Sequence, residues 1–179
     1  MYCGCNPTAL SSQTQISEAL TRLLAEKSYT KITVSELCRA SGVSRQTFYS
    51  LFSSMENVVV FTLQEKACRL PRETETLSSL EQLCKSYSAY ICENRDYLKM
   101  LVDNKVAYLL YDSIRASLLC RRAQSADASR REAQYTSHFL AGALTGVVQQ
   151  YCAEEPPPSA DVLDRMLRDL FSGVLFRQA

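Results

Sequence analysis

The sequence predicts an all-α fold of about nine helices. Apolar residues recur three and four positions apart along nearly all of the chain, whereas the apolar–polar alternation of a β-strand is hard to find. Glycine and proline, which interrupt helices, number only five each among 179 residues. Hydrophobic residues make up 46% of the chain, which is enough for a substantial core and argues against disorder.

Three helices are expected at the N-terminal end. The first runs from about Ser12 to Lys27, with apolar residues at positions i, i+4, i+7 and i+8. A short helix from Val34 to about Ser41 follows and ends at Gly42, which can take a left-handed turn. A second short helix opens at Ser44, which can cap it, and ends near Phe52.

The remaining helices are longer. A fourth is capped by Ser53 or Ser54 and ends near Pro71. Apolar stripes then predict five more helices, over residues 77–91, 97–102, 106–119, 135–151 and 162–175. A polar, charged segment and a proline-rich segment precede the last two, and Ser159 is the expected cap of the final helix.

Composition excludes several classes of protein. The formal net charge is only +1, so the chain as a whole is not a basic nucleic-acid binder, and any DNA contact has to come from a local patch. We expect no membrane span, because there is no run of about 18 apolar residues. The N-terminus lacks the features of a secretory signal, so we expect a cytoplasmic protein.

Eight cysteines are many for this length, yet their spacing does not indicate a metal site. No CxxC pair occurs, and His138 is the single histidine, so a zinc site would need almost only thiolates. We expect no metal and no cofactor, and most cysteines should be free, buried thiols. The cysteines are at positions 3, 5, 38, 68, 84, 92, 120 and 152.

The segment GVSRQTFYSLF, residues 42–52, combines long polar side chains with large apolar ones. Two short helices joined at a glycine form a helix-turn-helix, whose second helix lies in the major groove of DNA. If Phe48, Leu51 and Phe52 face the core, the opposite face of this helix is polar. That outward face would hold Arg45, Gln46, Thr47, Tyr49 and Ser50.

These side chains suit base recognition. Arg45 can read guanine bidentately, Gln46 can read adenine, and Thr47 offers a hydroxyl or a methyl group to thymine, while the Tyr49 hydroxyl can reach a phosphate. Residues 22–52 contain five basic and two acidic side chains, a local net charge of +3. Two simpler interpretations stay open, namely a half-buried Tyr49 ring and a solvated ion pair of Arg45 with Glu56.

The stretch ITVSELCRASGVSRQTFYSLFSSMENVV resembles the DNA-binding region of the TetR family of bacterial transcriptional regulators. The resemblance covers about residues 12–65, and a looser similarity points to regulators like the dihydroxyacetone kinase activator. It implies an all-α homodimer that binds double-stranded operator DNA through an N-terminal three-helix head, and a C-terminal domain that binds a small effector of unknown identity and dimerises. The implied domains are a flexible N-terminus at 1–11, a helix-turn-helix domain at 12–53 and an effector-binding and dimerisation domain at 54–179.

The resemblance also assigns roles to residues. It implies that Arg45, Gln46 and Thr47 read bases, and that Thr33, Ser44, Tyr49 and, with less weight, Lys31 contact the DNA backbone. Thr33 and Ser44 could instead be helix caps only, and the two roles are compatible. Met55 departs from the family, because a lysine that grips a phosphate is usual at the start of the fourth helix, so we carry no contact over to it.

The last two long helices have wide apolar stripes, which favour a four-helix bundle formed with a second subunit, although both helices could simply be core. The predicted dimer interface comprises Phe139, Leu140, Ala143, Leu144, Val147, Leu163, Leu167, Leu170 and Phe171. Tyrosines in the middle of the chain could line an effector pocket or be ordinary core and surface residues. The predicted pocket comprises Tyr87, Tyr90, Tyr108, Tyr111, Cys84 and Met100.

The sequence therefore predicts a DNA-binding regulator that represses transcription and is controlled by a small effector. Two alternatives stay open: a regulator controlled by thiol oxidation, and a helical adaptor that has lost DNA binding. An enzyme is not indicated, because a lone histidine, no glycine-rich phosphate loop and no paired carboxylates leave no catalytic constellation.

Overall fold

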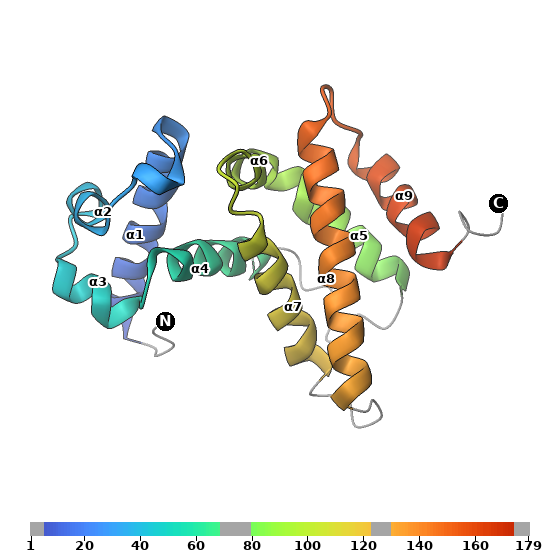
Figure 1. Cartoon of the computed structure of the whole chain (residues 1–179), viewed down its shortest axis with the longest axis horizontal. Coiled ribbons are helices and arrows are strands. Elements are labelled where there is room, and N and C mark those ends of the chain that lie inside the picture. Colours follow the sequence, from blue (N-terminus) through green and yellow to red (C-terminus); the bar gives the residue numbers. More distant parts are fainter. Residues whose placement is uncertain (1–5, 69–79, 123–129, 174–179) are drawn as a thin grey trace.

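The structure is a computed structural model, and it describes residues 6–68, 80–122 and 130–173. Within these ranges it contains nine α-helices, one short 3-10 helix and no β-strand, so the all-α prediction is confirmed (Figure 1). A small N-terminal head lies on one side of the molecule, and the long helices of a second bundle lie on the other.

The head consists of α1 (Pro7–Glu26), η1 (Tyr29–Lys31), α2 (Val34–Ser41) and α3 (Arg45–Leu51). Its three α-helices contact one another and enclose a small apolar core. The fully or nearly fully buried side chains of this core include Ile16, Leu20, Leu24, Leu37, Phe48, Leu51 and Phe52. A core of this size fixes which side of each short helix faces outward.

Helix α1 begins five residues before its predicted start. Asn6 caps it, with its side chain accepting a hydrogen bond from the Thr8 amide at 3.0 Å, and Pro7 occupies the first helical position. Proline is favoured there because the first helical N–H has no partner within the helix. Residues 7–11 are therefore helical, contrary to the predicted flexible N-terminus, and positions 1–5 lie outside the described residues.

Helix α4 (Met55–Cys68) connects the head to the second bundle and packs on both α1 and α7 (Figure 1). Ser54 lies just before it and accepts a hydrogen bond from the Asn57 amide at 3.4 Å, as expected of a cap. Between α1 and α4, Ser17 and Thr62 share a buried hydroxyl–hydroxyl hydrogen bond of 2.7 Å. A buried polar pair of this kind favours one register between the two helices.

The second bundle contains α5 (Leu80–Glu93), α6 (Arg95–Asp103), α7 (Tyr108–Arg122), α8 (Arg130–Ala153) and α9 (Ala160–Ser172). Helix α8 packs on α7 and α6, while α9 packs on α5. Ser159 caps α9 as predicted, accepting from the Val162 amide at 3.4 Å, and Gly173 ends the helix in a left-handed conformation. The predicted end of this stripe, at residues 174–175, lies outside the described residues.

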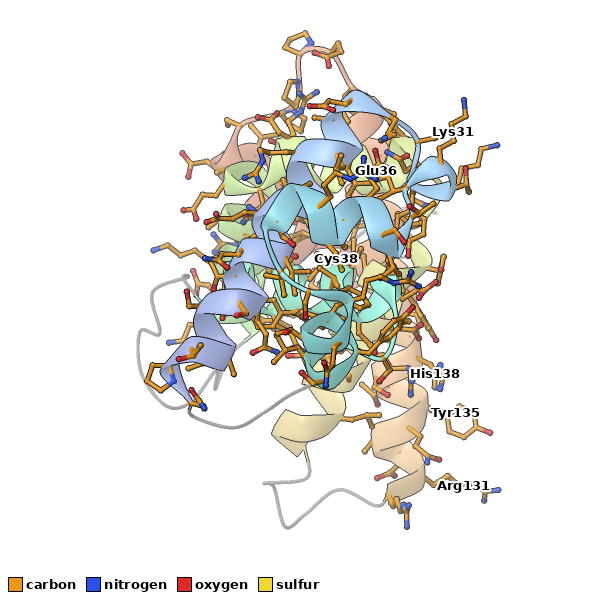
Figure 2. All side chains as sticks on the ribbon, turned by 90° about the vertical axis from the view of Figure 1, so that its left-hand side faces the viewer. Lys31, Glu36, Cys38, Arg131, Tyr135 and His138 are labelled. Atoms are coloured by element: carbon orange, nitrogen blue, oxygen red, sulfur yellow. The ribbon has the colours of Figure 1, made fainter. Side chains whose placement is uncertain are left out.

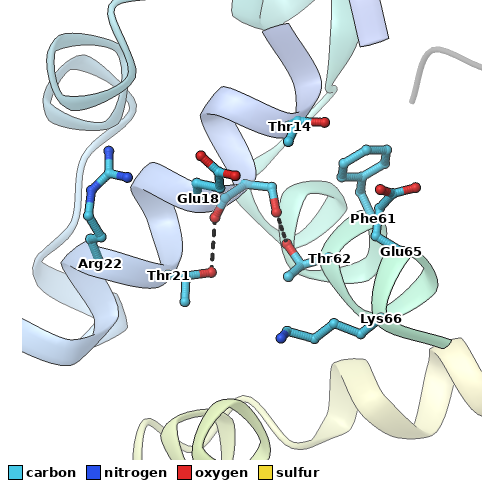
Figure 3. A pocket seen from close by; sticks show the side chains of 9 residues that line it. Thr14, Glu18, Thr21, Arg22, Phe61, Thr62, Glu65 and Lys66 are labelled. Carbon is cyan, nitrogen blue, oxygen red and sulfur yellow. Dashed lines mark hydrogen bonds between the residues drawn. The ribbon is translucent and has the colours of Figure 1, made fainter. Parts of the chain in front are cut away.

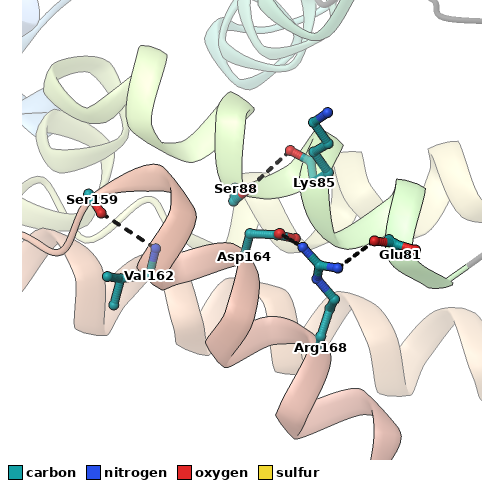
Figure 4. A network of polar contacts seen from close by, with 7 residues as sticks. All are labelled: Glu81, Lys85, Ser88, Ser159, Val162, Asp164 and Arg168. Carbon is teal, nitrogen blue, oxygen red and sulfur yellow. Dashed lines mark hydrogen bonds and ion pairs between the residues drawn. The ribbon is translucent and has the colours of Figure 1, made fainter.

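One ion-pair network holds α9 against α5 (Figure 4). The Arg168 guanidinium pairs with Asp164 one turn earlier in α9 and with the Glu81 carboxylate of α5, 2.6 Å away. Asp164 is almost fully buried, so its charge needs this partner. The side of α9 that carries Asp164 and Arg168 therefore packs on α5 of the same subunit.

Among the residues that the structure describes, none of the helices combines the length and the apolar character that crossing a lipid bilayer requires.

Candidate nucleic-acid interface

The turn between α2 and α3 has the predicted geometry. Gly42 lies in the left-handed region with φ 71° and ψ 12°, and the Val43 amide donates to the Cys38 carbonyl at 3.2 Å. Left-handed backbone is costly for residues with a Cβ, which explains the glycine at this position. The turn sets the angle at which α3 leaves α2.

Serine and threonine caps fix the starts of both helices. The Thr33 hydroxyl accepts from the Glu36 amide at 3.2 Å, and the Ser44 hydroxyl accepts from the Thr47 amide at 3.0 Å. Both side chains are thus engaged as caps, as the sequence predicted, and both residues are also exposed. Their capping role does not prevent contact with a partner at the surface.

The inward face of α3 is aromatic. Phe48 is fully buried, and its ring centroid lies 6.0 Å from that of Phe52 and 5.3 Å from that of Tyr49, the latter in an edge-to-face arrangement. Leu51 is buried beside them. These contacts prevent α3 from rotating about its own axis without exposing a large ring.

The outward face carries the predicted base-reading residues. Arg45, Gln46 and Ser50 are exposed and Thr47 is half-buried, because its hydroxyl lies 2.8 Å from that of Ser44. Tyr49 is 55% exposed although its ring edge packs on Phe48, so it is a surface residue rather than a core ring. The side chains that would reach a DNA groove are therefore accessible at the surface of α3, Thr47 partly so.

Arg45 makes no ion pair with Glu56 within the described part of the chain. The pKa of the Glu56 carboxyl lies below its usual value, first because the Ser54 hydroxyl hydrogen-bonds to it. Burial also raises the pKa of Tyr29 beyond its ordinary value, and the neighbouring Glu56 carboxylate adds to this effect. Glu56 thus faces η1, and the Arg45 guanidinium remains available.

Three other residues bear on the predicted DNA contacts of the head, namely Lys31, Lys27 and Met55. Lys31 is exposed and projects from the head in Figure 2. Lys27 forms an ion pair with Glu36, and this partner lowers the pKa of the Glu36 carboxyl. Met55, at the start of α4, is partly buried against the core, so it fills space where many family members carry a lysine.

The predicted effector residues lie in different surroundings within the described part of the chain, and their role in a pocket stays a prediction. Tyr90 is buried, whereas Tyr108 is exposed and lies towards Tyr29 of the head. Tyr111 is half-buried, and its hydroxyl hydrogen-bonds to His138 Nδ1 of α8.

Of the other three predicted pocket residues, Tyr87 lies close enough to Tyr90 to affect its pKa. Cys84 lies next to Asp164 and Arg168 at the contact of α5 with α9, while Tyr87 and Met100 are half-buried elsewhere on the bundle. The six residues belong to three helices, α5, α6 and α7, so their surroundings depend on how these helices pack rather than on closeness along the chain.

The predicted dimer residues divide into two groups, which corrects part of that prediction. Leu144, Leu163 and Leu167 are buried within one subunit, because α8 packs on α6 and α7 and α9 packs on α5. Leu140 is half-buried at the border of the two groups. The others line a shallow apolar hollow of about 390 Å³ formed by Phe139, Ala143, Gly146, Val147, Gln150, Leu170 and Phe171.

Sequence reasoning missed part of this surface. Tyr135, Val162 and Met166 are exposed beside the hollow, and Phe139 is 68% exposed. The 162, 166 and 170 positions repeat every four residues, and this spacing was the available signal for one outward apolar row on α9. We call the surface formed by Tyr135, Phe139, Val162, Met166 and Leu170 the α8–α9 face.

A second hollow, which the sequence did not suggest, lies between α1 and α4 (Figure 3). It has a volume of about 330 Å³ and a mixed lining of hydroxyl, acidic and basic side chains around the Ser17–Thr62 hydrogen bond. Its lining residues are Thr14, Ser17, Glu18, Thr21, Arg22, Phe61, Thr62, Glu65 and Lys66.

Cys38, Cys84, Cys92 and Cys152 are free thiols, and of these four only Cys92 is not fully buried. Burial raises the pKa of the Cys38, Cys84 and Cys152 thiols, which favours the unreactive protonated form. No group of three or more histidine, cysteine or acidic residues among the described positions could hold a metal ion.

A three-helix head with a capped, glycine-hinged second helix and an exposed polar face defines a helix-turn-helix DNA-binding protein. Residues 16–60 match the family model described as "Bacterial regulatory proteins, tetR family". The resemblance of the N-terminal head to the DNA-binding region of TetR-family regulators, which the sequence suggested, is thereby confirmed. Members of this family are DNA-binding proteins rather than enzymes.

Solved structures share the fold at low sequence identity. Lin0861 from Listeria innocua aligns with a TM-score of 0.80 and 14% identity, over 97% of this chain and 96% of that one. A TetR transcriptional regulator from Streptococcus agalactiae aligns with a TM-score of 0.59 and 16% identity, over 91% and 94%. The dihydroxyacetone kinase operon activator DhaS aligns with a TM-score of 0.55 and 17% identity, over 90% and 94%. No curated protein matches the sequence.

Proposed function

We propose that this chain is a repressor that binds operator DNA as a homodimer, and that a small effector held by the C-terminal domain controls this binding. The observation that carries the proposal is the two-sided α3, with a fully buried Phe48 on one side and an exposed Arg45 and Gln46 on the other. A helix so anchored presents the same side chains to every DNA site it meets.

Arg45, Gln46 and Thr47 are the proposed base-reading residues. Arginine and glutamine can each make two hydrogen bonds to one base, and each such pair contributes about 1–3 kcal/mol of discrimination. Thr33, Ser44, Tyr49 and Lys31 are proposed to contact phosphates, which positions the head without selecting a sequence. Since Met55 supplies no charge, affinity should be lower than in relatives with a lysine there, whereas sequence preference should be unaffected.

The α8–α9 face supports the homodimer. Its exposed aromatic and aliphatic side chains surround the apolar hollow, and a self-complementary contact would remove them from water. Leu144, Leu163 and Leu167 take no part in the revised interface, because they are core residues of one subunit.

Repression is the simpler of the two regulatory outcomes, because occupying DNA is sufficient for it, whereas activation needs a further contact with the transcription machinery. DhaS is named an operon activator, so likeness of fold does not decide between repression and activation. The effector site is proposed for the C-terminal domain on the family relationship alone. The thiol-based alternative has less support, since three of the described thiols are buried and burial raises their pKa.

The test compares two double variants. Sites would be selected from a random DNA library with the parent protein, and affinity would then be measured by fluorescence anisotropy. Arg45→Ala/Gln46→Ala should lose about 1,000-fold in affinity for the selected site, because two base contacts of about 1 kcal/mol each are removed from each of the two proposed subunits. Arg131→Ala/Gln134→Ala is the matched control, since these exposed residues lie at the start of α8, outside the head.

Equal affinity of the two double variants for the selected site would contradict the assignment of α3. If the parent protein itself selected no sequence while remaining folded, the adaptor alternative would replace the proposed function.

A further inference from the structure

One side chain joins the second bundle directly to the head. The Asn104 Oδ1 atom accepts a hydrogen bond from the Tyr29 backbone amide at 2.6 Å, across 75 positions of the sequence. The amide nitrogen of the same side chain donates to the Met100 carbonyl at 2.9 Å, within the last turn of α6. Asn104 therefore binds α6 with one end and the head with the other.

The Tyr29 amide needs this partner. Tyr29 is the first residue of η1, and the amides at the start of a helix have no acceptor within it. The residue is buried, and Glu56 of α4 and Tyr108 of α7 lie close enough to affect the Tyr29 pKa. Tyr29 thus occupies the junction where η1 meets α4, α6 and α7.

The position of Asn104 is fixed by a tight corner between α6 and α7. The Lys105 amide donates to the Val102 carbonyl at 3.0 Å, and the Val106 amide donates to the Leu101 carbonyl at 2.9 Å. Lys105 has φ 60°, a left-handed conformation that is uncommon for a residue with a side chain. Because the corner is held by its own backbone, Asn104 moves only when the end of α6 moves.

We propose that Asn104 is a positioning residue that couples the orientation of the head to the α6–α7 corner. A shift of this corner changes or breaks the Tyr29 contact and so alters how η1, α1 and α2 sit on α4. The effect on DNA affinity rests on the proposed function, whereas the mechanical join between the two parts does not.

The chain contains a matched control. Asn94 lies at the junction of α5 and α6, and its side-chain nitrogen donates to the Tyr90 carbonyl four residues earlier, also at 2.9 Å. Within the described residues, the hydrogen bonds of Asn94 stay inside the second bundle. Asn94→Ala therefore removes the same helix-terminal contact as Asn104→Ala, but no contact with the head.

The experiment is amide hydrogen exchange of the full-length protein, followed at Tyr29 by NMR. Asn104→Ala should make the Tyr29 amide exchange about threefold to tenfold faster, the factor expected for one lost neutral hydrogen bond. Asn104→Asp keeps an oxygen in place and should retain protection, while Asn94→Ala should leave Tyr29 unchanged. If Asn104→Ala fails to fold, Asn104→Gln replaces it with the same expectation, because the amide is then displaced by a methylene.

Unchanged exchange at Tyr29 in folded Asn104→Ala, or equal acceleration in Asn94→Ala, would overturn the proposal. A second arm measures affinity for the selected DNA site. Asn104→Ala should change this affinity by a larger factor than Asn94→Ala when the two variants have similar thermal stability. Asn104→Asp should restore the affinity of the parent protein, which would not happen if Asn104 only stabilised the fold. Equal affinities would exclude Asn104 as a coupling residue for DNA binding, whereas a parent protein that selects no DNA site contradicts only the proposed function, since the exchange arm needs no DNA.

Discussion

Replacing Phe48 by alanine tests whether the buried face of α3 anchors the exposed one. The Phe48 side chain is fully buried, and its ring packs on those of Tyr49 and Phe52. Substitution of a buried phenylalanine by alanine costs about 3–5 kcal/mol, because apolar surface is lost from the core and a cavity remains. A small head built from three helices has little scope to close that cavity, so we expect a loss within this range.

The assay is urea unfolding followed by circular dichroism, at one fixed protein concentration because the proposed dimerisation would contribute to apparent stability. With a denaturant slope of about 2 kcal/mol/M, the expected loss lowers the transition midpoint by about 1.5–2.5 M. Gln46→Ala is the control on the same helix, and because Gln46 is exposed its effect should stay within about 0.5 kcal/mol. A loss below about 1 kcal/mol for Phe48→Ala would refute the view that this ring fixes α3.

Three further predictions concern the dimer, the turn and pH. Phe139→Lys, at a side chain that is 68% exposed, should shift the sedimentation profile from dimer to monomer, and an unchanged profile would remove Phe139 from the interface. Gly42→Ala should lower the free energy of unfolding by about 1–2 kcal/mol through backbone conformation alone, since no other residue beyond the chain neighbours lies within 4 Å of the added Cβ. Gly42→Asn should lower it by less. Equal thermal stability of Gly42→Ala and the parent protein would contradict the role of the left-handed turn. The ion pair with Lys27 lowers the pKa of the Glu36 carboxyl in the folded protein. The ion pair therefore adds to the free energy of unfolding at pH values above the ordinary pKa of 4.5, and this addition is lost as the pH falls through the lowered pKa. The stability difference between the parent and Glu36→Gln should therefore shrink from about pH 7 to about pH 3 in urea titrations, and a constant difference would show that the ion pair does not contribute.

Local signals explain why the head was predictable from sequence. The bounds of α2, the left-handed Gly42 and the start of α3 each depend on a cap, a glycine or a short apolar repeat within a few residues. The start of α1 was missed although its signal was present, since Asn6 followed by Pro7 is a common helix beginning.

The second bundle was harder to predict, because the burial of each side chain depends on contacts between residues far apart in the sequence. Leu144 and Phe139 belong to the same apolar stripe of α8, yet one is buried in its own subunit and the other is exposed. The sequence shows how wide an apolar stripe is, but it does not show which neighbouring helix or subunit covers each side of it. Tyr108 and Tyr111 are three residues apart, yet Tyr108 lies near Tyr29 of the head, whereas Tyr111 hydrogen-bonds to His138 of α8.

The shortness of α3 limits how much sequence one subunit can distinguish. Its seven residues extend for about 10 Å at a rise of about 1.5 Å per residue. Stacked base pairs are about 3.4 Å apart, so the helix lies alongside about three of them. Two such triplets recur by chance many times in any genome, and selectivity then has to depend on the separation of the triplets and on how easily the intervening duplex bends. Altering the number of base pairs between the half-sites should therefore disturb recognition as strongly as altering a contacted base.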